Sequence, residues 1–378
     1  MIITRKIQIY VCEDDKELKK DFIHTIYEWR DLVRRAANTI VAHKFTQENI
    51  KEFVYLKDEI KDKFYVKDII KDGKGMSEQN TTYRVLSDIL KGKVPSDIYS
   101  CLNQSVANTF KETKIDLWTG KAELRSYKNN IPIPFSSNSI TKLNWNNEYK
   151  RFYFTLFGIP FATALGRDRS NNKVIIERIL SGEYKMCSSS IQIDDNKKKT
   201  FLLLCVDIPK KEIELQKDKK LYAFLGVLNP IICTTEVNAD LYVSVDEAYR
   251  VWEIGTEEEF NYRRRQIQEA VKRCQINNRY SVGGKGRKKK TQAIDRYHEK
   301  ESNYVTTKLH TYSRMLVDLA VKNECSEIIL MKQKEREEKA KDDNKNEKPF
   351  VLRNWSYFGL KEKIKYKTDM YGIKLTVI

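Results

Sequence analysis

Hydrophobic and polar residues change their spacing several times along the chain. Residues 3–11 alternate apolar and polar at every second position, which predicts a β-strand. From Lys16 to about Phe45 the apolar residues recur at helical spacing, which predicts an amphipathic helix. Two more helices are predicted over residues 79–91 and 95–122, and the second begins with Pro-Ser-Asp, a sequence typical of helix starts.

After residue 124 short alternating segments replace the helical spacing. The predicted strands cover residues 140–145, 151–157, 175–181, 184–193 and 199–208. Short strands separated by polar turns are typical of a β-barrel. We expect the strand over residues 3–11 to join this barrel, so that the helical segment is an insertion between its strands.

The last part of the chain combines strands and helices. An apolar strand over residues 221–234 is followed by an alternating stretch at 240–254, a charged helix at 256–275 and a loop rich in Gly and Lys. The remaining predicted elements are a long helix at 291–323, a buried strand at 326–331, a helix at 355–371 and a strand at 373–378. This order predicts a mixed sheet covered by helices.

The net charge indicates the class of partner. Lys and Arg total 70 against 53 Asp and Glu, a formal charge of +17. A polyanion such as nucleic acid is the expected partner, because each neutralised phosphate releases counterions. A lysine-rich composition without any such function is the alternative.

Two basic clusters are candidate nucleic-acid contacts. The first is the run at 285–290, whose basic members Lys285, Arg287, Lys288, Lys289 and Lys290 are predicted to bind phosphates. The second is the triplet Arg263, Arg264 and Arg265 on the charged helix. That helix also carries Glu257, Glu258 and Glu259, so ion pairs on a solvated face are an equal alternative.

The seven cysteines argue against a metal or disulfide framework. No two of them lie within four residues of each other, which disfavours a zinc ribbon or a redox motif. Scattered thiols favour a reducing compartment, and the N-terminus lacks an apolar signal segment. We therefore expect a cytoplasmic location and no membrane contact, since no apolar run is long enough to span a bilayer.

The last part of the chain resembles the RuvC-like, or RNase H-like, domain of the TnpB family and its small CRISPR type V relatives. The similar segments occur in the same order over residues 221–378. They are Leu225–Ile231, Glu259–Arg265, Gly283–Lys290, Lys300–Tyr304 with His310 and Ser313, and Tyr366–Lys374. The N-terminal half is similar in organisation more than in motif.

The resemblance implies a nuclease site that this sequence does not match. Such nucleases hold two Mg²⁺ ions with three carboxylates. The first position corresponds to Phe224 and the second to Met331, while the third lies beyond a zinc ribbon that would follow Ile378. We therefore predict no catalytic residue, no magnesium and no zinc, and hence no enzyme activity.

Other acids could replace these positions only by an unusual shift. The acids considered as replacements are Asp207, Asp240, Glu327 and Glu335, and residues 221–234 contain no acid. A shift of one residue along a strand moves a side chain to the other face of the sheet. Misalignment that brings Glu327 or Glu335 to the second position is the alternative for that position.

The predicted fold is an α+β multidomain protein. Residues 1–12 and 125–215 form a β-barrel, wedge-like domain, and residues 13–124 form an inserted helical recognition domain. Residues 216–378 form a truncated RuvC-like domain without zinc ribbon or final helix. By the resemblance, Gln79, Asn80 and Tyr83 near a helix start are candidates for reading a short DNA motif that flanks the target.

The resemblance implies a bacterial, transposon-derived, nuclease-dead repressor. Its partners would be a guide RNA and a double-stranded DNA target, and it would block transcription by forming an R-loop. A monomer is slightly favoured. The alternatives are a nuclease-dead CRISPR type V effector, an active Mg²⁺-dependent nuclease with unrecognised ligands, and a decayed transposon product.

Overall fold

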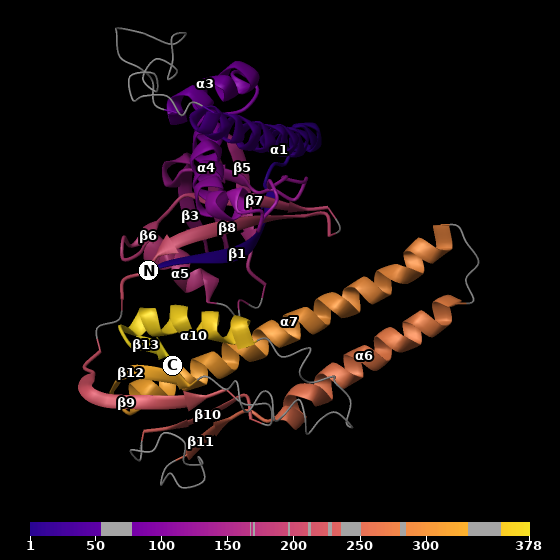
Figure 1. The fold of residues 1–378 in the computed structure, drawn as a ribbon. Coiled ribbons are helices and arrows are strands. Elements are labelled where there is room, and N and C mark those ends of the chain that lie inside the picture. The colour runs from indigo at the N-terminus through magenta and orange to yellow at the C-terminus, as the bar shows by residue number, and fades with distance from the viewer. Residues whose placement is uncertain are drawn as a thin grey trace. The chain divides into compact units, whose positions relative to one another are not determined.

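The computed structural model describes two compact units, residues 1–208 and 209–378 (Figure 1). The described residues are 1–53, 78–166, 168, 171–195, 197–210, 213–225, 229–235, 251–279, 285–331 and 357–378. Residues 332–349, which lie between the predicted strand at 326–331 and the predicted helix at 355–371, are outside them.

The first unit is built on an antiparallel sheet of eight strands. They are β1 (Ile2–Val11), β2 (Ile133–Phe135), β3 (Ile140–Asn146), β4 (Arg151–Leu156), β5 (Ile159–Ala164), β6 (Lys185–Met186), β7 (Ser189–Asp194) and β8 (Lys199–Asp207). The strand order is β2-β7-β8-β1-β5-β4-β3, and β6 pairs with β8. The first strand of the chain therefore lies inside the sheet, between β8 and β5.

The predicted barrel is corrected by this strand order. In the described part of the chain the hydrogen-bonded path is open and ends at β2 and β3, so the sheet is not closed. Strand β2 is only three residues long and contains Pro134. Proline has no backbone N–H, which limits further pairing at this edge.

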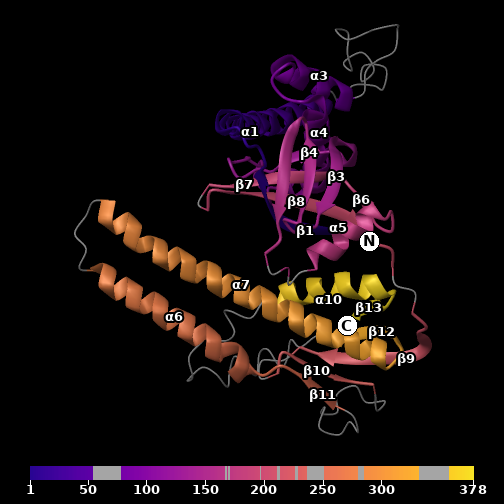
Figure 2. The same ribbon diagram turned by 180° about the vertical axis from the view of Figure 1, so that it is seen from behind.

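Four helices in the described part of this unit contribute to the core on the sheet's apolar side. They are α1 (Lys16–Phe53), α3 (Glu78–Leu90), α4 (Ser96–Trp118) and α5 (Asn172–Leu180), and a 3-10 turn, η1, covers Ser137–Ser139. Helices α1, α3 and α4 gather together in both ribbon views (Figures 1 and 2). Side chains of α1, such as Trp29 and Val33, share one buried core with Ile7 of β1 and Phe152 of β4.

One segment predicted as a strand is a helix. Residues 175–181 fall in α5, where Ile175 and Ile176 are buried. The Asp168 carboxylate accepts hydrogen bonds from the backbone N–H groups of Asn172 and Lys173, at 2.8 and 2.7 Å. This cap satisfies N–H groups that the first helical turn leaves without partners, a signal that the apolar spacing alone does not show.

The second unit contains a mixed sheet of five strands. They are β9 (Gln216–Phe224), β10 (Ile231–Thr234), β11 (Val251–Ile254), β12 (Cys325–Met331) and β13 (Lys374–Val377). The order is β11-β10-β9-β12-β13, in which the first three strands are antiparallel and β12 is parallel to both β9 and β13. This is the mixed sheet that the sequence predicts.

Three helices accompany this sheet among the residues that the structure describes. They are α6 (Glu257–Arg279), α7 (Lys285–Lys322) and α10 (Tyr357–Tyr371). Helix α6 packs along α7, and the pair projects away from the sheet of its own unit (Figures 1 and 2). Helices α7 and α10 bury Leu316, Leu360 and Ile364 against it.

Two predicted elements of this unit are corrected. Residues 221–234 form two antiparallel strands, β9 and β10, because the turn sequence Asn229-Pro230 separates two short apolar runs. Residues 285–290, predicted as part of a loop, form the first turns of α7. Among the described residues, no helix is long and apolar enough to cross a membrane.

Candidate functional site

The two positions that correspond to the expected carboxylates meet in the sheet of the second unit. Phe224 is the last residue of β9 and Met331 the last residue of β12. The parallel pairing places these two residues directly opposite each other. Because carboxyl ends of adjacent parallel strands meet at one edge, this is where a strand-end site would be built.

The surroundings of this edge are apolar. The preceding pair, Ala223 and Leu330, is fully buried, and Leu225 is 3 % exposed. Phe224 itself is partly exposed. A divalent magnesium ion requires oxygen ligands, and the Phe224 side chain offers none. The described residues of this edge therefore do not fit a magnesium ion.

Glu327 lies at the opposite end of the same strand pair. Its carboxylate contacts Lys220 Nζ at 3.4 Å and Lys374 Nζ at 3.3 Å, and it accepts a hydrogen bond from Thr376 Oγ1 at 2.5 Å. The Thr376 hydroxyl and then the two ammonium groups lower the pKa of Glu327 below its ordinary value, although partial burial opposes them. It lies four positions before residue 331 and joins three strands, so it does not replace an acid at that position.

The other candidate replacements lie in the first unit or outside the described residues. Asp207 belongs to the first unit, where its carboxylate binds the Met1 amino nitrogen at 2.6 Å. Asp240 and Glu335 lie outside the described residues. Across the part of the chain that the structure describes, His, Cys, Asp and Glu form no group of three that could hold a metal ion.

The arginine triplet divides into one buried and two exposed residues. Arg264 is 4 % exposed, and its Nε and Nη2 donate to Glu301 Oε1 at 3.0 and 2.8 Å. Arg263 and Arg265 are exposed on α6, where Arg263 also donates to Gln266. Arg264 therefore joins α6 to α7. The predicted nucleic-acid contacts of Arg263, Arg264 and Arg265 stay predictions.

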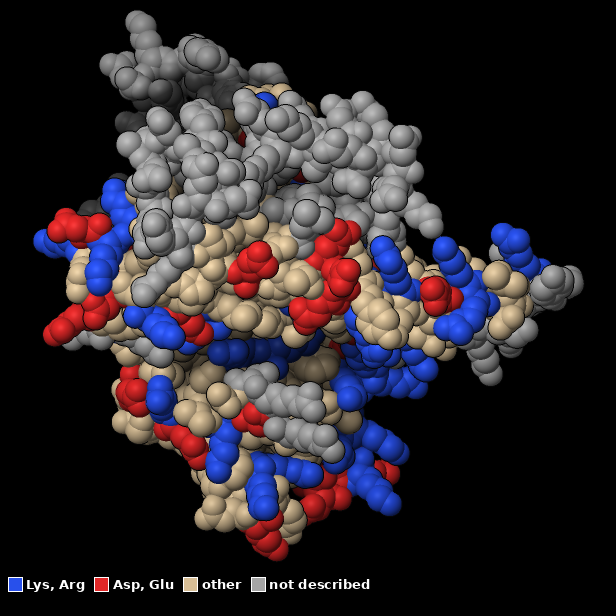
Figure 3. Space-filling view, turned by 90° about the horizontal axis from the view of Figure 1, so that it is seen from below, with Lys and Arg blue, Asp and Glu red and all other residues tan. Residues whose placement is uncertain are grey.

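The basic run at 285–290 begins α7, but its side chains lie outside the described part. The predicted phosphate contacts of Lys285, Arg287, Lys288, Lys289 and Lys290 therefore stay predictions. Basic side chains gather along the projecting α6–α7 pair, at the right of Figure 3, with acidic ones between them. Mixed charge on this helix pair agrees with both interpretations of α6, namely nucleic-acid contact and ion pairs on a solvated face.

The three residues predicted to read a DNA motif lie on one helix. Gln79 and Asn80 are exposed in the first turn of α3. Tyr83 is partly buried, and its hydroxyl donates to Tyr99 Oη at 3.4 Å. This hydrogen bond is the first cause of a raised pKa for Tyr83. Tyr83 thus contributes to packing between α3 and α4, and its predicted role in recognition stays untested together with those of Gln79 and Asn80.

A buried lysine in the second unit was not among the predicted site residues. Lys367 of α10 is 6 % exposed, and its ammonium donates to the His310 carbonyl and to Ser313 Oγ of α7. Burial lowers its pKa to about 8. On the outside of this contact, Tyr366 Oη lies 3.1 Å from His310 Nδ1. The resemblance had pointed to His310, Ser313 and Lys367 as motif positions, and their role here is to join two helices.

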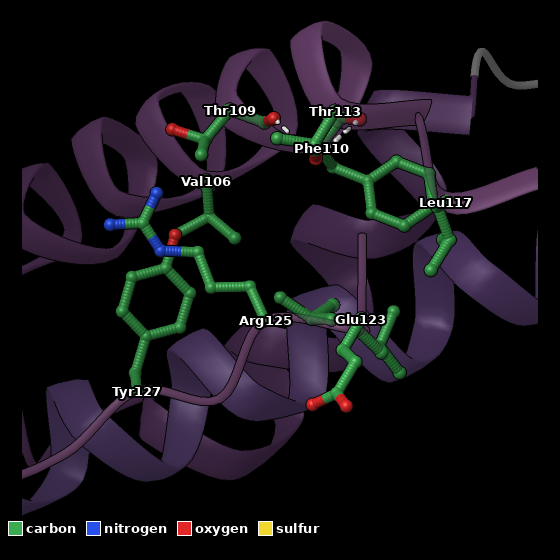
Figure 4. Close-up of a pocket in the computed structure, with 10 residues that line it drawn as sticks. Val106, Thr109, Phe110, Thr113, Leu117, Glu123, Arg125 and Tyr127 are labelled. Atoms are coloured by element: carbon green, nitrogen blue, oxygen red, sulfur yellow. Dashed lines mark hydrogen bonds between the residues drawn. The ribbon is translucent and has the colours of Figure 1, made fainter. Parts of the chain in front are cut away.

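A small cavity in the first unit lies between α1, α4 and residues 123–127 (Figure 4). Val106, Phe110 and Leu117 of α4 line it, and Arg125 lies over the Tyr127 ring at 5.2 Å. Its volume of about 10 Å³ is of the order needed for one water molecule. The cavity is therefore too small to hold a nucleotide or another organic cofactor.

Comparison with known proteins identifies relatives of this chain. No protein-family model matches it. It is 27 % identical over 281 residues to the CRISPR-associated endodeoxyribonuclease Cas12f1 of Sulfoacidibacillus thermotolerans, covering 71 % of this chain and 62 % of that protein. It is 26 % identical over 303 residues to Cas12f1 of Syntrophomonas palmitatica, covering 72 % of this chain and 57 % of that protein. The matches span about three fifths of the length of these curated relatives.

A solved structure supports the same relationship at the level of fold. The chain matches a protein from the cryo-EM structure of a Cas12f1-sgRNA-target DNA complex with a TM-score of 0.67 and 14 % identity, covering all of this chain and 89 % of that one. The chain is therefore homologous to the Cas12f1 proteins, small TnpB-like type V CRISPR effectors, and has their fold.

Proposed function

We propose that this protein is an RNA-guided DNA-binding protein that does not cut its target. The observation that carries the proposal is the pairing of Phe224 with Met331 at the carboxyl ends of β9 and β12. The relatives are endodeoxyribonucleases, and the structural match comes from a complex with sgRNA and target DNA. The excess of Lys and Arg suits polyanionic partners.

The strand order supports the assignment of these two positions. In the second unit the order third-second-first-fourth-fifth, with the fourth and fifth strands parallel to the first, agrees with the RNase H-like sheet that the resemblance implies. Two metal ions in such a site clamp the attacking and leaving oxygens of the phosphodiester. Phe224 provides no ligand oxygen, and neither Phe nor Met is a ligand type for magnesium.

Binding without cleavage would be sufficient for repression. A guide RNA would pair with one DNA strand, and the protein would hold the heteroduplex through its backbone and read a short flanking motif. The resulting R-loop over a promoter would exclude RNA polymerase. In this proposal the strands of the first unit form the wedge-like part, the helices between β1 and β2 form the recognition part, and a monomer acts at the bacterial nucleoid.

The test is to purify the protein from its host background and sequence the RNA that remains bound. A guide-matched DNA duplex is then incubated with the RNA-loaded protein, with Mg²⁺ or with EDTA. We expect one RNA species, binding to matched DNA and no cleavage in either condition. The proposal fails if the protein retains no RNA and binds no guide, or if it cuts DNA only when Mg²⁺ is present.

The second candidate function is an active nuclease. The names of the two curated relatives favour it, and Asp240 and Glu335 lie outside the described residues. EDTA-sensitive cutting would identify this case. A nuclease-dead CRISPR effector would bind in the same way, and a bound RNA derived from a CRISPR array would distinguish it from a repressor guided by a transposon-end RNA.

A further inference from the structure

The sheet of the first unit has one face that its own core does not use. In β1, the side chains of Ile7, Ile9 and Val11 enter the core, so those of Lys6, Gln8 and Tyr10 lie on the opposite face. The neighbouring strands follow the same alternation. We call this opposite face, formed by β1, β4, β5, β7 and β8, the outer face.

Two tyrosines lie in one row across the outer face. Tyr10 of β1 and Tyr153 of β4 both pair with Ala162 of β5, which lies between them. Ala162 is fully buried although its side chain is on the outer face. Both tyrosines are partly exposed. The row is therefore two aromatic rings on either side of a small residue, which leaves a shallow aromatic surface.

Two cations lie over aromatic rings on this face. The Arg151 guanidinium carbon is 5.3 Å from the centre of the Tyr10 ring, and Arg151 also donates to the Tyr10 hydroxyl. Lys6 Nζ is 4.4 Å from the centre of the Phe201 ring and donates to Gln192 Oε1 at 3.0 Å. Both cations are exposed, so the contacts hold them in place without removing them from solvent.

Acidic residues are confined to strand ends. Among the eight strands of this sheet, acids occur only at Asp194 and Asp207, the last residues of β7 and β8. Asp207 is bound to the Met1 amino nitrogen. Acids next appear beyond β1, from Glu13 onward. The middle of the outer face thus combines aromatic rings, amides and positive charge.

We infer that the outer face binds a single-stranded polynucleotide with unpaired bases. Bases stack on Tyr rings and on guanidinium planes without regard to sequence, and cations attract the phosphates between them. In a base-paired duplex the bases face each other and are not available to stack on the Tyr rings. A protein partner would not require the positive charge of Lys6 and Arg151. Alternate residues of β1 are about 7 Å apart, which spaces Lys6, Gln8 and Tyr10 along an extended strand.

The inference deepens the proposed function by giving it a surface for an unpaired strand, and it rests on that function only for the source of the strand. The same chemistry would serve an unpaired part of a guide RNA or a displaced DNA strand. Binding of fluorescent 12-nucleotide oligouridine and oligodeoxythymidine, measured by anisotropy, distinguishes these two sources. The protein used is the full chain after removal of bound RNA.

The first variant pair tests stacking. Tyr153→Leu should weaken oligonucleotide binding about five- to hundredfold, because stacking of one base is lost. Tyr153→Phe keeps the ring and should bind like the unchanged protein. Neither substitution should alter the salt dependence of the dissociation constant. Equal binding by the Leu variant and the unchanged protein would overturn the inference.

The second variant pair tests the cation on the outer face. Arg151→Gln should weaken binding and reduce the slope of log K against log salt by about 0.7, the value for one phosphate of a single strand. Arg178→Gln is its matched control. Arg178 lies 5.2 Å from the Tyr184 ring and donates to its hydroxyl, but on α5, whose neighbouring isoleucines pack in the core.

Arg178→Gln should change neither the affinity nor the slope beyond the effect of one remote charge. An effect equal to that of Arg151→Gln would reduce the inference to non-specific attraction and overturn it. Circular dichroism of each variant confirms the fold. The probes are free oligonucleotides, so this test does not depend on a guide RNA. If the protein binds them at the outer face but carries no guide, only the proposed function is rejected. If neither variant pair gives the expected result, only the inference is rejected.

Discussion

The two ends of the β9–β12 strand pair differ in the charge they carry. At one end Glu327 lies among Lys220, Lys374 and Thr376. At the other end Phe224 pairs with Met331, and the described neighbours are apolar. Both ends belong to the same two strands, so the charge of the side chains differs between the two ends of one strand pair. Glu327 stabilises the sheet, and the end where a metal site would need acids has Phe and Met.

The helices α6 and α7 of the same unit are joined by charged side chains, as the strands are at Glu327. Arg264 and Glu301 form a nearly buried ion pair between α6 and α7, and Gln268 donates to the same carboxylate at 3.1 Å. At both of these places in the described part of the unit, charged side chains join neighbouring elements. The following experiments test whether acids in this unit are structural where they occur, and whether their introduction at positions 224 and 331 is enough to bind a metal.

The largest effect is expected from loss of the buried ion pair. Glu301→Ala leaves the Arg264 guanidinium buried without that carboxylate, and we expect it to lower the free energy of unfolding by about 3 kcal/mol. Urea denaturation measures it. Removal of the exposed Glu269 on α6 is the control and should cost less than about 0.5 kcal/mol. Similar losses for both variants would mean that this acid is not structural.

A smaller effect is expected from acids placed at the apolar end. The double substitution Phe224→Asp and Met331→Asp puts two like charges at paired positions, and we expect a loss of about 2 kcal/mol without divalent metal. Millimolar Mg²⁺ should return part of this loss, because it binds the folded state. Thermal unfolding with and without Mg²⁺ measures it.

The control for this experiment is the pair Phe224→Asn and Met331→Asn, which has similar size and polarity but no charge. It should show no response to Mg²⁺, like the unchanged protein. A comparable rise in Tm for the unchanged protein would indicate that this chain already holds Mg²⁺, and would remove the contrast between the two strand ends.

The smallest effect is expected at Glu327. Glu327→Gln keeps the shape but removes the charge that Lys220 and Lys374 contact, and we expect a loss of about 1 kcal/mol at pH 7. The pKa of Glu327 is lowered in the folded state, so the folded protein binds fewer protons than the unfolded chain. Its stabilisation is therefore complete above the ordinary value of 4.5 and is lost as the pH falls through the lowered pKa.

The measurement is urea denaturation of both proteins from pH 7 down to pH 3. The difference between them should shrink below about pH 4, and 1 M salt should reduce it at pH 7. A difference that stays constant with pH would show that the Thr376 hydrogen bond, and not the charge, accounts for the effect.

The sequence predicts best those elements of this chain whose apolar residues keep one regular spacing. Strand β12 and helices α1, α6 and α7 have enough apolar residues at one spacing to identify them. Helix α5 is nine residues long and depends on the Asp168 cap, and β9 and β10 form one apolar run in sequence that only the intervening turn divides. Strand β5 was not predicted, because Pro160 interrupts its alternation and four of its six residues are buried.

The candidate site was predicted in part. Phe224 and Met331 were identified from a resemblance, and the strand register brings them together. The burial of Arg264 could not be read from three consecutive arginines, because it depends on Glu301, which is 37 residues away. The outer face was missed for a similar reason, since Tyr10 and Tyr153 meet only through their common neighbour Ala162.

The position of β1 has a consequence for synthesis of the chain. Its residue Ile2 pairs with Asp207, so β1 must wait for one of the last strands of its unit to leave the ribosome. At typical elongation rates this takes roughly 10–40 s. During that time the edge of β1 that pairs with β8 is without its partner, and Arg5 and Lys6 in the middle of β1 disfavour pairing with other nascent chains. Two cations that end in a folded sheet can thus also act as gatekeepers against aggregation before that sheet exists.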